Sequence, residues 1–166
     1  MYPQLKQTYP MIIIISAMTK EHHVIGKNNW LPWSIPEELQ LFRQNTVGST
    51  IIMGRKTYNG LGRLMPKRHN IIVSRKTDLK IPGADVCPSI ENALTFAKKD
   101  NTTIFIIGGA EIFKAGIPFA DKMYLSFIKQ DYAGDTYFPN FNKEEWEEES
   151  TQDYPDFEFV ILKRKC

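Results

Sequence analysis

Short apolar runs alternate with amphipathic or polar segments along most of the chain. Met11–Ala17 is continuous, β-branched and short, which is typical of a fully buried strand. Ile35–Thr46 repeats its apolar residues at helical spacing. The same reasoning predicts strands at Thr50–Met53, Asn70–Ser74, Ala84–Cys87, Thr103–Ile107 and Met123–Ile128, and helices near Arg55, over Ile90–Lys98 and from Ala110. This alternation predicts an α/β fold whose mostly parallel sheet has helices on both faces.

The two ends of the chain differ from this pattern. Trp146–Gln152 and Phe157–Lys165 predict two strands joined by the turn at 153–156, an antiparallel hairpin. Residues 1–10 are polar and contain two prolines, so we expect a flexible N-terminal extension. At 166 residues the chain has room for one substantial core, and residues 11–166 are interpreted as a single domain.

Composition excludes several classes of protein. The chain has 21 Lys and Arg against 19 Asp and Glu, a balance that argues against a nucleic-acid binder. The longest apolar run, Met11–Ile15, is too short to span a bilayer, and no membrane partner is expected. Two cysteines do not form a disulfide framework, which indicates a reduced, cytoplasmic protein. His22 and His23 are adjacent loop residues and are interpreted as solvated, so no metal site is predicted.

The helix at 35–46 places a carboxylate among apolar side chains. Ser34 and Glu37 have the spacing of a capping box, and Pro36 fits the first turn. Glu38 lies within the predicted buried stripe of Ile35, Leu39, Phe42 and Thr46. A carboxylate there has a raised pKa unless it is paired, and such groups often mark functional sites. Two other interpretations stay open: Glu38 pairs with a buried arginine, or the helix is rotated so that Glu38 reaches solvent.

Two strand-to-helix junctions contain glycine. The first passes from a buried strand through Gly54 to Arg55 and Lys56, and the second passes through Gly108 and Gly109. Free backbone N–H groups at such helix starts suit a phosphate, although the spacing of a Walker loop is absent. Each glycine site alone predicts no more than a tight turn. Together with Ser74-Arg75 after a third strand, they indicate a nucleotide with several phosphates, over which the loop 18–34 acts as a lid.

Five motifs, in order and suitably spaced from Met11 to Lys165, resemble the dihydrofolate reductase family. They are Val24-Ile-Gly26, Leu31-Pro-Trp33, Ile52-Met-Gly-Arg-Lys-Thr57, Ile107-Gly-Gly109 and Gly134-Asp-Thr-Tyr-Phe-Pro139. The resemblance implies a central eight-stranded, mostly parallel sheet with an antiparallel C-terminal strand and about four flanking helices. It also implies reduction of 7,8-dihydrofolate to 5,6,7,8-tetrahydrofolate, with hydride passing from NADPH to C6 and water protonating N5.

The resemblance assigns a role to Glu38, which matches the acidic residue that binds the pterin and assists protonation. Trp33 and Ser126 match the residues that support this acid and its water. Arg68 matches the arginine that grips the α-carboxylate of the glutamate tail. The other residues matched to the substrate site are Ile15, Ala17, Leu39, Phe42, Leu61, Ile107 and Phe113.

The resemblance assigns a second set of residues to NADPH. Arg55, Ser74 and Arg75 match the surroundings of its 2′-phosphate, and Lys56 and Thr57 match its pyrophosphate end. Gly108–Gly109 matches a cis peptide beside the nicotinamide. The remaining matched residues are Ala17, Ile25, Gly26, Leu31, Gly54, Ile107, Ala110, Glu111, Ile112 and Phe113. The loop Asn28–Trp33 resembles a mobile lid, and Gly134-Asp135 resembles the loop that holds this lid closed.

Three departures from the family pattern affect details. Many bacterial relatives have Asp where this chain has Glu38, Phe113 stands where Tyr is common, and the loop between Ala17 and Val24 is one residue longer than in some relatives. The resemblance also implies antifolate binding and a monomer. Two rival interpretations are a pyrimidine reductase of riboflavin synthesis with the same fold, and a folate- or nucleotide-binding protein without catalysis.

Overall fold

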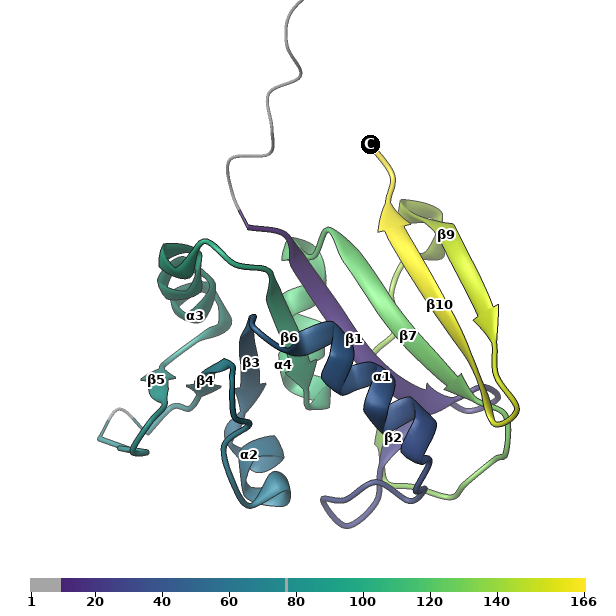
Figure 1. Cartoon of the computed structure of the whole chain (residues 1–166), viewed down its shortest axis with the longest axis horizontal. Coiled ribbons are helices and arrows are strands. Elements are labelled where there is room, and N and C mark those ends of the chain that lie inside the picture. The colour runs from purple at the N-terminus through teal and green to yellow at the C-terminus, as the bar shows by residue number, and fades with distance from the viewer. Residues whose placement is uncertain (1–9, 77) are drawn as a thin grey trace, which may run out of the picture.

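A central sheet of eight strands organises the protein, whose computed structural model describes residues 10–76 and 78–166. The strand order is β5-β4-β3-β6-β1-β7-β10-β9 (Figure 1). These strands are β1 (Ile12–Thr19), β3 (Thr50–Gly54), β4 (His69–Val73), β5 (Asp85–Cys87), β6 (Ile104–Gly108), β7 (Lys122–Ile128), β9 (Trp146–Asp153) and β10 (Phe157–Arg164). All the predicted strands are present, with boundaries that differ by one or two residues.

The strand directions confirm the predicted topology. Pairing is parallel from β5 across to β7, and β10 is antiparallel to both β7 and β9. The carboxyl ends of the parallel strands therefore meet at one edge, the lower edge in Figure 1. A small second sheet of β2 (Val24–Gly26) and β8 (Thr136–Tyr137) lies outside the main one, and sequence patterns did not predict it because both strands are so short.

Alternate residues of the central strands fill two separate cores, as the two-residue period of a strand requires. Ile13 and Ile15 of β1 pack with Phe42 of α1 on one face. Ile12 and Ile14 pack on the other face. The helices are α1 (Pro36–Thr46), α2 (Arg55–Leu61), α3 (Ile90–Ala97) and α4 (Ala110–Gly116), with 3-10 turns η1 (Lys98–Asp100), η2 (Ile117–Phe119) and η3 (Lys143–Glu145).

Two helices pack on each face of the sheet. Side chains from α1 and α2 contribute to the clusters around Ile13 and Trp33, whereas α3 and α4 contribute to the cluster around Ile14. Burying one such isoleucine contributes about 1.5–3 kcal/mol, so the mostly apolar central strands hold the sheet firmly between its helices. The sheet is thus a rigid support for the loops and helix ends at its carboxyl edge.

Two details predicted for α1 are wrong. Ile35 occupies the N-cap with extended backbone (φ −125°, ψ 97°) and no side-chain cap, so Ser34 and Glu37 form no capping box. Pro36 at the first helical position, as predicted, disfavours helical geometry at the residue before it. Leu39 is exposed, not buried, because it lies about 100° around the helix from Glu38 and outside the face that meets the sheet.

The predicted N-terminal extension, residues 1–10, lies outside the described part of the chain except for Pro10. Among residues 10–76 and 78–166, no helix has both the length and the apolar character needed to cross a membrane.

Candidate active site

Glu38 lies on the face of α1 that meets the sheet, between Ile35 and Phe42, which belong to the two apolar clusters of that face. Its side chain is partly exposed and makes no hydrogen bond or ion pair with the residues described here, so the predicted alternative of a buried arginine partner is wrong. Burial raises its pKa from 4.5 to about 7. The carboxyl group is therefore poised to exchange a proton near neutral pH.

Trp33 and Ser126 are both buried on the side of the sheet that carries α1. Ser126 of β7 pairs in register with Ala17 of β1, which belongs to the same apolar cluster as Trp33. The indole Nε1 of Trp33 is a buried donor without a partner among the described residues. Buried donors are normally satisfied, so this N–H indicates a place for a water molecule or a ligand acceptor.

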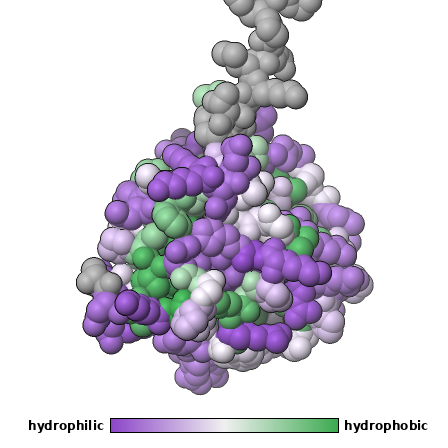
Figure 2. Space-filling view, turned by 60° about the vertical axis from the view of Figure 1, so that its left-hand side comes forward, coloured by the Kyte–Doolittle hydropathy of each residue, from purple (hydrophilic) through white to green (hydrophobic). Residues whose placement is uncertain are grey.

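Apolar residues from α1 and α2 remain at the surface next to this face. Leu39 of α1 is 43% exposed and Leu61 of α2 is 41% exposed. Figure 2 shows apolar side chains reaching the surface in patches bordered by hydrophilic ones. Exposed leucines on two helices that flank one sheet edge offer contact area to a flat apolar ligand.

The remaining residues predicted for the substrate lie deeper. Ile15, Phe42 and Ile107 pack together in the core beneath α1. Phe113 lies on the opposite face of the sheet, where its ring packs against Phe138 at a centroid distance of 5.1 Å. That ring also lies close to Gly108, because a Cβ there would be 3.3 Å from it.

Arg68 is held in place by the carboxyl end of α1. Its Nε donates to Thr46 Oγ1 at 2.9 Å, Nη2 donates to the Arg43 carbonyl at 2.9 Å, and Nη1 donates to the Pro66 carbonyl at 2.6 Å. One N–H remains on each terminal nitrogen, which matches the two oxygens of a carboxylate. The guanidinium is thereby oriented before any ligand arrives.

Gly54 and the Gly108–Gly109 pair bring α2 and α4 close together at the carboxyl edge. The Gly108–Gly109 peptide is cis, as predicted. A Cβ on Gly54 would lie 3.0 Å from Ile112, and one on Gly109 would lie 3.4 Å from the Thr57 hydroxyl. Neither helix has a side-chain cap, so backbone N–H groups remain free at both starts.

Basic side chains stand beside these junctions. Arg55 and Lys56 begin α2, and Arg75 is exposed after β4. Ser74 is buried, and its hydroxyl accepts the N–H of Lys76 at 3.2 Å. The ends of β3 and β6 carry glycines and uncapped helix starts, and the ends of β3 and β4 carry basic side chains. Together these neighbouring strand ends fit a nucleotide with phosphate groups.

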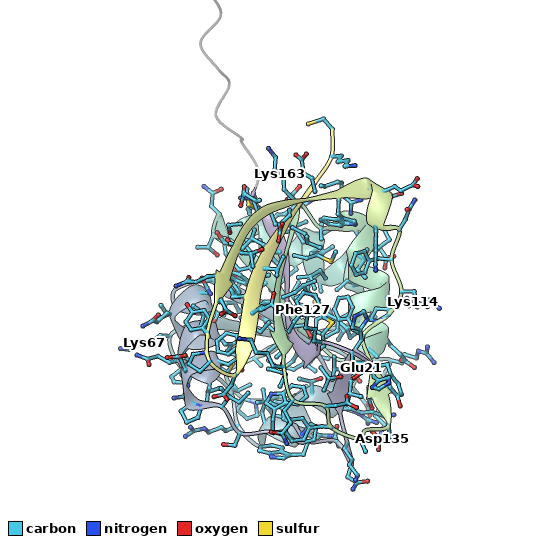
Figure 3. The ribbon with its side chains drawn as sticks, turned by 90° about the vertical axis from the view of Figure 1, so that its right-hand side faces the viewer. Glu21, Lys67, Lys114, Phe127, Asp135 and Lys163 are labelled. Carbon is cyan, nitrogen blue, oxygen red and sulfur yellow. The ribbon has the colours of Figure 1, made fainter. Side chains whose placement is uncertain are left out.

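The predicted lid forms a tight turn. Lys27 and Trp30 exchange backbone hydrogen bonds, and Asn28 and Asn29 have positive φ angles. The Asn28 N–H donates to Asp135 Oδ2 at 3.0 Å, which lowers the pKa of that carboxyl. Asp135 is at the lower end of the molecule in Figure 3, the edge where the parallel strands end.

A match to the family model "Dihydrofolate reductase" extends over residues 11–164. The chain belongs to the dihydrofolate reductase family. It is 43% identical to the dihydrofolate reductase of Haemophilus influenzae over 93% of this chain and 100% of that protein, and 36% identical to that of Bacillus subtilis over 93% and 95%. A solved dihydrofolate reductase of Enterococcus faecalis, complexed with NADP(H) and RAB-propyl, superposes with a TM-score of 0.88 at 32% identity, covering 95% of this chain and 99% of that one.

Two further contacts in this member of the dihydrofolate reductase family were not predicted from the sequence, one at the predicted lid and one outside it. A Cβ on Gly60 of α2 would lie 2.8 Å from the Asn29 carbonyl, so the lid turn rests on α2. The Asn28-Asn29 dipeptide, typical of a tight turn, was the available signal. Outside the lid, the exposed His22 lies beside Glu21 and Asp131, with Nδ1 3.0 Å from the Asp131 carboxylate.

Proposed function

We propose that the protein catalyses the NADPH-dependent reduction of 7,8-dihydrofolate to 5,6,7,8-tetrahydrofolate, with Glu38 as its proton-handling residue. The observation that carries this proposal is the Glu38 carboxyl on the inner face of α1, which has no partner among the described residues and whose pKa is raised to about 7 by burial. A carboxylate without a protein partner is available to the amino group and ring nitrogen of a pterin.

Substrate binding uses the residues around Glu38. Arg68 binds the α-carboxylate of the glutamate tail through its two remaining N–H groups. Leu39 and Leu61 cover the ring system from α1 and α2, with Ile15, Phe42, Ala17 and Ile107 forming the apolar floor. This placement is supported by the exposure of the two leucines and the fixed orientation of Arg68.

NADPH binding uses the junctions after β3, β4 and β6. Arg55, Ser74 and Arg75 hold the 2′-phosphate, Lys56 and Thr57 hold the pyrophosphate, and Gly108–Gly109 and Phe113 adjoin the nicotinamide. The uncapped starts of α2 and α4 support this assignment. When bound, NADPH supplies the hydride for C6 of the dihydropterin. The remaining contacts are assigned to Ala17, Ile25, Gly26, Leu31, Gly54, Ala110, Glu111 and Ile112.

Proton delivery to N5 depends on the field of Glu38. At neutral pH a carboxyl with this pKa is partly ionised, so it stabilises a positive pterin and a water molecule that carries the proton. The Trp33 indole and the Ser126 hydroxyl position the carboxyl and its water. The lid from Asn28 to Trp33 excludes bulk water while Asp135 holds it closed.

We further propose that the enzyme acts as a monomer in the cytoplasm and binds antifolates at the pterin site. Cys87 and Cys166 are free thiols, as is usual in a reducing compartment.

The test is NADPH oxidation, followed by absorbance, with dihydrofolate as substrate and the Glu38→Gln variant beside the exposed control Glu37→Gln. We expect turnover in the wild type and in Glu37→Gln, and a sharp loss near neutral pH in Glu38→Gln. Tight methotrexate binding without turnover in the wild type would instead indicate a binding protein. Absence of both would indicate a pyrimidine reductase.

A further inference from the structure

The amino-terminal edge of the sheet, opposite the proposed active site, carries a chain of polar groups around His69. His69 begins β4, Asp85 begins β5, and Asp100 ends η1, just before β6. His69 Nε2 lies 2.5 Å from Asp85 Oδ2, and His69 Nδ1 lies 2.5 Å from Asp100 Oδ2. One imidazole ring therefore contacts a carboxylate through each of its two nitrogens.

This arrangement favours the protonated ring. A neutral imidazole has one N–H donor, and its other nitrogen is an acceptor. Between two ionised carboxylates, the acceptor nitrogen would face an oxygen lone pair without a hydrogen. The imidazolium donates to both carboxylates, so binding the second proton removes a repulsion and creates a charge-assisted hydrogen bond.

The other groups around this cluster come from β3, α3, η1 and β5. Thr50 of β3 donates to the same Asp100 oxygen at 2.7 Å, which favours the ionised carboxylate. From α3, the Phe96 ring meets the imidazole edge-on at 5.8 Å, and Lys99 lies over that Phe96 ring. Cys87 on β5 is a buried thiol whose pKa is raised by burial and by Asp85.

The pKa directions agree with the geometry. Burial acts to lower the pKa of His69, but the hydrogen bonds and charges of Asp100 and Asp85 outweigh it and raise that pKa above 6.5. Burial acts to raise the pKa of Asp100, but the hydrogen bonds from Thr50 and His69 outweigh it and lower that pKa below 3.8.

The cluster adds side-chain contacts between segments that are otherwise joined by backbone pairing and by the packing of α3. β5 is a three-residue strand at the edge of the sheet and pairs with β4 in the part of the chain that the structure describes. The contact between His69 and Asp85 ties the first residue of β5 to the first residue of β4. The contact between His69 and Asp100 ties the turn before β6 to the same point.

We propose that Asp85, His69 and Asp100 form a pH-dependent latch, which holds β5 and the η1 turn against the sheet while His69 is protonated and loosens them when the proton leaves. His69 has the higher pKa in the folded state, so its contribution is complete below the ordinary pKa of 6.5 and is lost as pH rises through the folded value. The stabilisation from ionised Asp100 is lost only in acid, as pH falls through the lowered pKa of this carboxyl. The latch is therefore strongest in mild acid.

The first test is an NMR titration of the His69 ring in the whole protein. We expect a pKa above 6.5 in the wild type and a lower one in Asp85→Asn and in Asp100→Asn. Amide hydrogen exchange supplies the second readout: protection factors in β5 should fall in the wild type as pH rises from mild acid through the His69 pKa. If the contacts with Asp85 and Asp100 raise the His69 pKa by one unit, breaking them at high pH should lower the protection factor about tenfold.

His22→Gln is the matched control, since it removes a histidine–aspartate contact outside the latch. This variant should retain the wild-type pH dependence of β5 exchange, whereas Asp85→Asn should lose it. A wild-type His69 pKa at or below 6.5 would overturn the proposal. So would β5 protection that does not change with pH, and neither measurement requires a His69 variant to fold.

Discussion

The backbone N–H of Asn28 donates to the Asp135 carboxylate at 3.0 Å, across 107 residues of sequence. The same carboxylate accepts the Thr136 hydroxyl at 2.9 Å, and the Asp135 N–H donates to the Gly26 carbonyl at 3.0 Å. Gly134 packs against Val24 so closely that a Cβ would collide with it. The proposed lid is thus held at its base by β-pairing and at its tip by a hydrogen bond to the Asp135 carboxylate.

Asp135→Ala should loosen the lid tip and leave its base paired. We expect turnover to fall roughly tenfold with little change in the KM for dihydrofolate, because lid closure completes the site without contacting the substrate tail. Steady-state kinetics at saturating NADPH would measure this. Asp131→Asn, a change to a nearby exposed carboxylate that pairs with His22, is the control and should keep wild-type turnover. Equal rates in wild type and Asp135→Ala would remove this contact from the closure step.

The sequence predicted the main sheet well because β-branched runs such as Met11–Ala17 are short, continuous and bounded by polar segments. It did not predict β2 and β8, since strands of three and two residues have no period of their own and exist through their mutual pairing. It also placed the N-cap of α1 wrongly. The capping-box spacing at Ser34 was genuine, but the backbone restriction imposed by Pro36 moved the helix boundary by one residue.

Glu38→Gln tests the proton route directly. A carboxyl with a pKa of about 7 should appear as an ionisation in the pH profile of kcat/KM for dihydrofolate. We expect the variant to lose this ionisation and to lose about 10²- to 10⁴-fold in turnover at neutral pH, the usual contribution of general acid–base catalysis. NADPH affinity, followed by fluorescence titration, should not change. A wild-type pH profile in the variant would assign the ionisation to another group.

Arg68→Lys should weaken binding of the glutamate tail, because a lysine ammonium cannot replace the paired N–H groups. Loss of a charge-assisted pair is worth about 1.5–3 kcal/mol, so the KM for dihydrofolate should rise about 10- to 100-fold with kcat nearly constant. Lys67→Ala, at the exposed neighbouring residue, is the control. A dihydropterin substrate without the glutamate tail should react equally with wild type and Arg68→Lys; a large difference there would indicate that the variant disturbs α1 instead.

Arg75→Gln should reduce the preference for NADPH over NADH. The exposed Arg75 follows β4 at the position proposed for the 2′-phosphate, which NADH lacks. We expect the KM for NADPH to rise about tenfold, the usual cost of one charge-assisted hydrogen bond, while the KM for NADH stays constant. Lys80→Gln, which removes an exposed charge further along the same loop, controls for net charge. Parallel increases for both nucleotides would place Arg75 outside the phosphate site.

Some features of the candidate site could be predicted from the sequence and others could not. Helical spacing placed Glu38 in the predicted buried stripe but left a solvent-facing orientation and an arginine partner open. In the structure Glu38 is half-buried and has no arginine partner among the described residues. Spacing could not reveal that Arg68 is oriented by Thr46 and by the Arg43 carbonyl, since these hydrogen bonds join a loop to the end of a helix 22 and 25 residues earlier. The Asn28-Asn29 dipeptide signals a tight turn, but it does not show that this turn contacts Gly60, because that contact depends on where α2 packs.

Glu38 should also be a cost to the stability of the ligand-free protein. Its pKa rises from 4.5 to about 7 on folding, so the folded state binds more protons than the unfolded state between these values, and stability falls as pH increases through this window. At 1.36 kcal/mol per pKa step, and allowing for partial exposure, the loss is about 1–3 kcal/mol. Glu38→Gln should therefore be more stable than wild type by that amount at about pH 8, with the difference shrinking towards about pH 4.5.

Urea unfolding at several pH values without ligands would measure this difference, with Glu37→Gln as the exposed control. Glu37→Gln should follow the wild-type pH dependence, because its carboxylate is solvated in both states. A gain in stability that accompanies the loss of turnover in Glu38→Gln is the pattern expected when a side chain is kept for its chemistry. If Glu38→Gln were less stable than wild type at about pH 8, the carboxylate would have a stabilising partner in the folded protein and would not be free for a pterin.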